Sequence, residues 1–137
     1  MLIINIDGAS RGNPGLSGIG IVITKENSKI IEHKEFIGSR TNNQAEYMAL
    51  KKAMQISLSL DSNITILSDS QLVVNQRTKD YKVRNKQLKN IFREISNLER
   101  YFQTVTYKHV PRSENRHADL LANQAIDEHI KYENASI

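Results

Sequence analysis

The chain has 137 residues, which is enough for one domain with its own hydrophobic core but short for two. Its 19 basic and 15 acidic side chains leave a net charge of +4, a weak attraction to polyanions. The absence of cysteine excludes disulfide scaffolds, thiolate zinc sites and cysteine nucleophiles. Because no apolar run reaches the roughly 20 residues of a membrane helix, and MLIINID does not resemble a signal peptide, we expect one cytoplasmic domain over residues 1–137.

The first third of the chain has the pattern of three β-strands. Apolar and β-branched residues predict strands at 2–6, 19–24 and 29–37. Residues 8–18 contain four glycines and a proline, so they predict a loop between the first two strands. The short polar segment 25–28 predicts a hairpin between the second and third strands, which makes these three strands antiparallel.

The rest of the chain alternates between helical and strand patterns. Apolar spacings of three and four predict helices, and short apolar runs predict strands, in the order helix 42–58, strand 63–67, a short helix from 68 or 69 to about 76, helix 88–98, strand 104–109 and helix 118–130. Thr41 or Asn42 is expected to cap the first helix, and the tail after about residue 131 is expected to be flexible. This order predicts an α/β fold with a mixed five-stranded sheet and helices on both faces.

Four acidic residues are expected to meet at one edge of this sheet. Asp7 and Asp69 each follow an apolar strand, where ligands collect in open sheets, and Glu46 and Asp119 lie beside the apolar faces of their helices. Clustered carboxylates repel one another unless cations lie between them, and oxygen ligands suit Mg²⁺ or Mn²⁺. Two such ions about 4 Å apart bind the attacking and leaving oxygens of a phosphodiester. The alternatives are local, because Asp69 could cap a helix and Glu46 could interact with a helix dipole.

Four short motifs carry a more specific signal. Residues 7–15 read DGASRGNPG, 41–46 TNNQAE, 68–71 SDSQ and 114–119 ENRHAD. In this order and at these intervals they resemble the four active-site blocks of the ribonuclease H type 1 family, in its compact prokaryotic, reverse-transcriptase-like branch. The resemblance covers about residues 2–126 and implies the ribonuclease H-like fold.

The resemblance implies a metal-dependent endoribonuclease that cleaves the RNA strand of RNA–DNA hybrids and leaves 3′-hydroxyl and 5′-phosphate ends. Two ions, Mg²⁺ or Mn²⁺, would be held in the substrate complex. In this pattern Asp7 bridges both ions, Asp119 binds one, and Glu46 and Asp69 bind the other. We expect the protein to be a monomer that binds an RNA–DNA hybrid and has no membrane partner.

The same resemblance implies contacts to the hybrid in its minor groove. Amide side chains donate to and accept from the 2′-hydroxyls that distinguish RNA from DNA, and glycine lets the backbone approach closely. By position, the implied contacts are Ser10, Gly12, Asn13, Asn42, Asn43 and Gln71. Thr41 matches a position that helps hold a phosphate of the DNA strand.

Further candidates lie outside the four carboxylates. His109 precedes Asp119 by ten residues, a spacing at which many type 1 enzymes carry a histidine that assists proton transfer or product release. It could instead simply end the last strand. Arg112 is a candidate for phosphate contact. A basic stretch within residues 77–89 is also expected to contact phosphates and to make binding salt-sensitive; its cations are Arg77, Lys79, Lys82, Arg84, Lys86 and Lys89.

Three other functions remain open from the sequence. One is a nucleic-acid-binding module of the same fold with little or no turnover, although the presence of all four carboxylates argues against it. Another is a DNA-processing nuclease of the integrase kind, against which the TNN turn and the GNPG segment favour hybrid recognition. The last is cleavage of double-stranded RNA in addition to hybrids.

Overall fold

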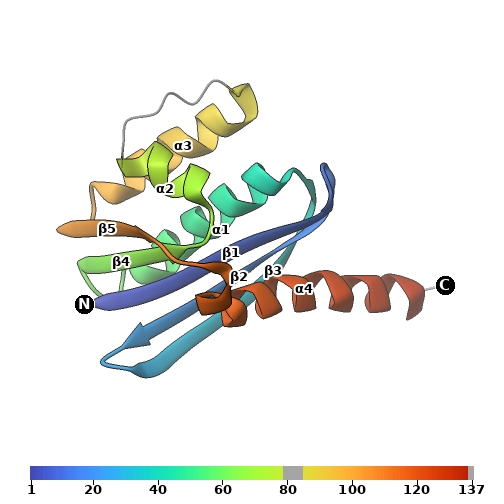
Figure 1. Ribbon diagram of the computed structural model, residues 1–137, viewed down its shortest axis with the longest axis horizontal. Helices are drawn as coiled ribbons and strands as arrows, with labels where there is room; N and C mark the ends of the chain where they lie inside the picture. The colour runs from blue at the N-terminus through green and yellow to red at the C-terminus, as the bar shows by residue number, and fades with distance from the viewer. Residues whose placement is uncertain (79–84, 136–137) are drawn as a thin grey trace.

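The computed structural model describes residues 1–78 and 85–135 as a five-stranded sheet with helices on both faces (Figure 1). The strands are β1 (Leu2–Gly12), β2 (Gly15–Lys25), β3 (Ser28–Arg40), β4 (Asn63–Ser68) and β5 (Thr104–His109). The helices are α1 (Asn42–Ser57), α2 (Gln71–Thr78), α3 (Lys86–Glu99) and α4 (Arg116–Ala135), the last preceded by a 3₁₀ turn, Arg112–Glu114.

The strands lie in the order β3-β2-β1-β4-β5, and this arrangement confirms the predicted mixed sheet. β1, β2 and β3 are antiparallel neighbours, whereas β4 runs parallel to both β1 and β5. Helices α1, α2 and α3 lie on one side of the sheet and α4 lies on the other (Figure 1).

The loop predicted over residues 8–18 is wrong. β1 continues through Gly12 and β2 begins at Gly15, with Gly8 opposite Ile19, so only Asn13 and Pro14 make the turn. The glycines serve close packing rather than a flexible loop. A Cβ on Gly8 would lie 2.3 Å from the backbone of Ala45, so α1 touches the strand directly.

The main core lies between the sheet and α1, where alternate strand residues point inward. Burial of apolar surface at these positions is the dominant stabilising term of the fold. Its fully buried strand residues are Leu2, Ile4, Ile6, Ile21, Ile23, Ile64 and Ile66. Tyr47, Leu50 and Met54 of α1 pack against them.

On the opposite face α4 packs directly onto the backbone of β2. A Cβ on Gly20 would lie 2.0 Å from the Ala118 carbonyl oxygen, and one on Gly18 would lie 2.3 Å from the Ala122 carbonyl oxygen. Ala118 directly precedes Asp119 in α4. The contact between Gly20 and Ala118 therefore fixes the position of the Asp119 carboxylate relative to the sheet.

In the basic stretch that is predicted to contact phosphates, the structure buries one cation and exposes two others. Arg77 is wrong as a phosphate contact, because its side chain is only 4% exposed. It donates from Nε to Glu99 at 3.0 Å and its guanidinium lies 4.4 Å from the centre of the Phe92 ring. Lys86 and Lys89 are exposed on α3. The remaining cations of the stretch lie outside the described residues: Lys79, Lys82 and Arg84.

The C-terminal helix is longer than the apolar pattern predicts. α4 continues to Ala135, past the point near residue 131 where the sequence predicts a flexible tail. No helix in the described part of the chain is both long and apolar enough to cross a membrane. A single domain over residues 1–137 stays a prediction.

We expect Gly20→Ala to destabilise the protein by about 3 kcal/mol, because the new methyl group must push α4 away from β2. Chemical denaturation measures this loss. Gly38→Ala is the matched control. Gly38 has a φ of +77°, but a methyl group added there would meet no atom within 4 Å, so only the backbone cost of about 1 kcal/mol applies. Equal losses in the two variants would contradict direct packing of α4 on Gly20.

Candidate active site

Four carboxylates from four elements converge at one cleft. Asp7 comes from β1, Glu46 from α1, Asp69 from the residue after β4 and Asp119 from α4. Oxygens of Asp7, Glu46 and Asp69 all lie within 4.8 Å of one another. Asp119 interacts with Asp7 and lines the same cleft, which has a volume of about 420 Å³. The structure therefore brings together all four acidic residues that the sequence singled out.

The parallel pairing of β1 and β4 places two of these side chains. Ile6 lies opposite Ser68, so Asp7 and Asp69 follow at the same end of neighbouring strands, as expected for a ligand site in an open sheet. Asp69 does not cap the following helix. The Ser70 hydroxyl accepts from the Val73 amide at 3.3 Å and so makes the cap itself.

Glu46 is placed by the start of α1. Thr41 is the N-cap: its hydroxyl accepts from the Gln44 amide at 3.1 Å, and the Gln44 side chain accepts from the Thr41 amide at 2.9 Å. This capping box satisfies two backbone donors and fixes the helix entry. Close contact with Gly8 then holds Glu46 against β1, where the Gly8 backbone also hydrogen-bonds it.

The cluster is electrostatically crowded. Burial raises the pKa of Asp7 to about 8, and the charges of Asp69 and Asp119 add to the effect. Burial and the charge of Asp7 also raise the pKa of Glu46 well above its usual value. The buried Glu46 Oε2 has no hydrogen-bond partner among the described residues. An oxygen donor set with an unsatisfied buried member fits a divalent cation such as Mg²⁺ or Mn²⁺.

Asn115 is a site residue that the sequence analysis did not single out. It is 1% exposed, and its Nδ2 donates to the Ile6 carbonyl at 2.8 Å and to Asp69 Oδ2 at 3.4 Å. Its backbone carbonyl accepts from the Asp119 amide, and its Oδ1 accepts from Asn5 at 3.1 Å. An asparagine just before an apolar helical pattern is a capping signal that could have drawn attention to it.

Asn123 and Arg11 also line the cleft and were missed. Asn123 Nδ2 donates to Asp119 Oδ1 at 3.2 Å and to the Asp119 carbonyl at 3.0 Å. Arg11 in turn contacts Asn123. The spacing of four residues between Asp119 and Asn123, which places both on one helix face, is the signal available in the sequence.

The two segments expected to contact a hybrid lie side by side. The Ser10 hydroxyl donates to the carbonyl at the end of β3 at 2.8 Å, and Asn13 Oδ1 accepts from the Asn42 amide at 3.0 Å. Ser10 and Asn42 line the carboxylate cleft. Gly12 has a φ of +116°, a conformation that favours glycine, and Asn43 is exposed in the first turn of α1.

The remaining candidates lie around the cleft. Arg112 lines it and is 82% exposed, with Nη2 3.9 Å from Asp119 Oδ1. Gln71 is exposed at the first residue of α2, and His109 ends β5 opposite Ser68, the residue before Asp69. Within the described residues, neither Gln71 nor His109 is part of the cleft wall.

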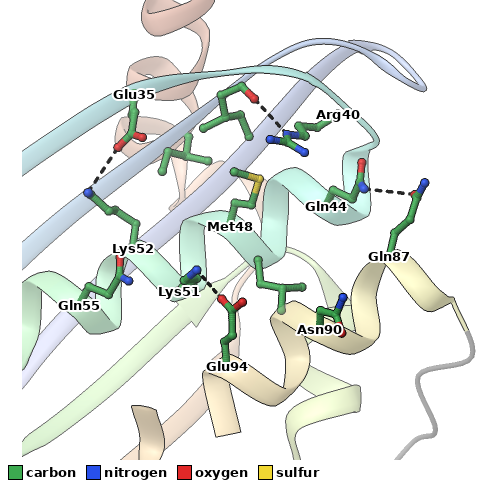
Figure 2. A pocket seen from close by; sticks show the side chains of 13 residues that line it. Glu35, Arg40, Gln44, Met48, Lys51, Lys52, Gln55, Gln87, Asn90 and Glu94 are labelled. Atoms are coloured by element: carbon green, nitrogen blue, oxygen red, sulfur yellow. Dashed lines mark hydrogen bonds and ion pairs between the residues drawn. The ribbon is translucent and has the colours of Figure 1, made fainter. Parts of the chain in front are cut away.

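A second depression of about 350 Å³ lies between β3, α1 and α3 (Figure 2). Its two lysines are engaged: Lys51 pairs with Glu94, and Lys52 lies 3.7 Å from Glu35. Both carboxylates that line it are therefore neutralised by neighbours, in contrast to the crowded cluster in the other cleft. The carboxylate cleft is the better candidate for chemistry.

Comparison with known proteins identifies the family of this chain. A family profile described as "Reverse transcriptase-like" matches residues 5–125. A bifunctional protein of Mycobacterium tuberculosis is 39% identical over 129 residues, covering 92% of this chain and 35% of that protein. The chain thus spans about a third of the length of this mycobacterial relative.

Two solved structures are similar over nearly their whole length. Ribonuclease H1 from Halobacterium salinarum has a TM-score of 0.89 at 36% identity, covering 93% of this chain and 98% of that one. LC11-RNase H1, solved with an RNA/DNA hybrid, has a TM-score of 0.89 at 37% identity, covering 95% and 99%. Fold and cleft together define a ribonuclease H-like protein. The chain belongs to the ribonuclease H family, in its reverse transcriptase-like branch.

The raised pKa of Asp7 predicts how stability depends on pH without metal. Asp7 stays protonated in the folded state up to about pH 8, whereas the pKa of an aspartate in the unfolded chain lies near 3.8. Unfolding in this window releases a proton, so stability falls as the pH rises from about 4 to 8. In EDTA at pH 8, we expect Asp7→Asn to melt about 5 °C above the wild type.

Thermal melts of both proteins at pH 5 are the control. At that pH the wild type loses much less stability through Asp7, so the difference in melting temperature between the two proteins should shrink. An Asp7→Asn variant that gains no stability at pH 8, or gains equally at both pH values, would contradict a raised pKa at this position.

Proposed function

We propose that this protein is an endoribonuclease that hydrolyses the RNA strand of RNA–DNA hybrids. The observation that carries the proposal is the convergence of four carboxylates on one cleft, where the buried Glu46 Oε2 has no hydrogen-bond partner among the described residues, in a chain of the ribonuclease H family. The similar LC11-RNase H1, solved with an RNA/DNA hybrid, supports the substrate class.

In the proposed mechanism the carboxylates divide the metal ligation among them. Asp7 lies between the others and would bridge two positions, with Glu46 and Asp69 on one and Asp119 on the other. Bound Mg²⁺ or Mn²⁺ supplies an activated water and stabilisation of the leaving oxygen. Hydrolysis of this kind leaves 3′-hydroxyl and 5′-phosphate ends.

The platform formed by the β1–β2 turn and the start of α1 would read the hybrid. Its side chains and backbone offer donors and acceptors for the 2′-hydroxyls of a wide minor groove. The proposed contacts are Ser10, Gly12, Asn13, Asn42, Asn43 and Gln71. Thr41 uses its oxygen to cap α1, and its hydroxyl proton is available to donate to a DNA phosphate.

Two exposed residues near the cleft complete the proposal. His109, at the end of β5, would assist proton transfer or product release, and Arg112 would contact a phosphate beside Asp119. The alternative is that His109 only ends the strand. Cleavage of double-stranded RNA, a monomeric state and a cytoplasmic location also stay predictions.

Cleavage of labelled substrates tests the function. With Mg²⁺ or Mn²⁺ we expect cleavage of a labelled RNA–DNA hybrid and none in EDTA, with single-stranded and double-stranded RNA as comparisons. Asp7→Asn should lower the cleavage rate by at least about 10³-fold, because the shared metal ligand loses its charge, while hybrid binding persists. Gel electrophoresis of the products measures both rate and end chemistry.

Glu133→Gln removes one negative charge from an exposed position of α4 and should leave the rate unchanged. Full activity in Asp7→Asn would refute the assignment. Tight hybrid binding without cleavage under any metal condition would favour the alternative of a binding module.

Hybrid binding should weaken as salt rises, because cations that contact phosphates release bound counterions. Lys86→Gln and Lys89→Gln should each reduce the slope of log affinity against log salt by about 1 if each lysine contacts one phosphate. Lys131→Gln, at an exposed position near the end of α4, should leave the slope unchanged. Affinity that stays flat from low to moderate salt would contradict the proposed phosphate contacts.

A further inference from the structure

Asp119 differs from the other three carboxylates in how it is held. Its side chain is 32% exposed, and its oxygens lie outside the close cluster that Asp7, Glu46 and Asp69 form. Asp119 is therefore the carboxylate whose orientation depends most on neighbouring donors. Asp119 interacts with Asp7, and two further side chains approach its Oδ1: Asn123 at 3.2 Å and the highly exposed Arg112 at 3.9 Å. Of these two, only Asn123 is at hydrogen-bonding distance.

The orientation of the Asn123 amide is determined by its two partners. Arg11 Nη2 lies 3.2 Å from Asn123 Oδ1, and a guanidinium can only donate. On the other side, the Asp119 backbone carbonyl lies 3.0 Å from Asn123 Nδ2, and a carbonyl can only accept. The Asn123 oxygen must therefore face Arg11 and its NH₂ group must face Asp119. Neither partner tolerates the flipped amide.

Arg11 is held on its other side by α4. Its Nη1 donates to Asp127 Oδ1 at 2.6 Å, and this contact lowers the pKa of Asp127. Asp119, Asn123 and Asp127 follow one another at intervals of four, so they line one face of α4. A continuous series of hydrogen bonds thus runs from Asp127 through Arg11 and Asn123 to Asp119. Arg11 belongs to the β1–β2 hairpin, so the series joins that hairpin to a catalytic carboxylate.

We propose that Asn123 and Arg11 are positioning residues, which together hold the Asp119 carboxylate in its productive orientation. The inference rests on the function proposed above and deepens it. Asn123 supplies the donor that orients Asp119, and Arg11 prevents the amide from flipping. Groups that orient metal-binding carboxylates typically change metal affinity or activity by about 10- to 100-fold when removed.

Kinetics on a labelled hybrid with Mg²⁺ tests the role of Asn123. Asn123→Ala should lower kcat by about 10-fold and change KM by less than about twofold, because the lost contact is to a reacting group rather than to substrate. Asn123→Asp keeps the shape and the contact with Arg11 but replaces the donor with an acceptor, so it should be at least as slow. A wild-type kcat in Asn123→Asp would overturn the proposal.

A double-mutant cycle tests whether Arg11 acts through Asn123. Arg11→Gln should lower kcat, and the double variant should be no slower than Asn123→Ala alone, because both changes remove the same effect. If Arg11 instead binds a substrate phosphate directly, the two losses add and the salt dependence of binding falls by about one phosphate. Additive losses would overturn the proposal.

Lys34→Gln is the matched control for Arg11→Gln. Lys34 also makes an exposed 2.6 Å ion pair from the sheet to α4, with Glu128, but away from the cleft. Its loss should leave kcat unchanged.

A readout independent of activity is the NMR spectrum without metal or nucleic acid. Arg11→Gln should shift the Asn123 side-chain amide and the Asp119 backbone amide resonances, and Lys34→Gln should shift neither. Unchanged resonances in Arg11→Gln would overturn the proposed connection from Arg11 through Asn123 to Asp119. A wild-type protein that fails to cleave hybrids would refute the proposed function, but it would leave this spectroscopic result standing.

Discussion

Burial of the Asp7 carboxyl on the central strand is the constraint on which the site depends. Its pKa is raised mainly by burial, and the acidic groups of Glu46 and Asp69 lie within 4.8 Å of it. Such crowding is possible only because backbone approaches backbone. Gly8 admits α1 on one face of the sheet, and Gly20 admits α4 on the other. The close packing of α1 and α4 on the sheet is therefore what brings the acidic side chains together.

Uncharged amides hold this cluster together. Asn115 donates to Asp69 and to the backbone of β1, and Asn123 donates to Asp119. An amide orients a carboxylate oxygen by a hydrogen bond without cancelling its charge, whereas a close arginine or lysine would neutralise it. The hairpin cation Arg11 is kept one step away, because it reaches Asp119 only through Asn123. Arg112 is the exception, because its exposed guanidinium lies 3.9 Å from Asp119 Oδ1 at the cleft.

Much of this arrangement could be predicted from the sequence because apolar periodicity reports burial, and the four acidic residues stand beside apolar runs or apolar helix faces. The predictions from sequence fail where the structure depends on tertiary contacts, which local patterns do not encode. The glycines of residues 8–18 suggest a loop, but pairing between β1 and β2 makes most of them strand. Arg77 reads as one cation in a basic stretch, but Glu99 and Phe92 bury it. The spacing of four residues from Asp119 places Asn123 on the same helix face, but only the fold shows that Arg11 contacts it.

The hydrogen bonds of Ser10 to the end of β3 and of Asn13 to the Asn42 amide have a consequence for molecular recognition. They join the hairpin turn and the first turn of α1 into one continuous surface. A surface that is already arranged loses little conformational entropy when it binds. In the proposed complex with a hybrid, the spacing of its donors and acceptors would match one groove width, and a duplex of different width would not fit it.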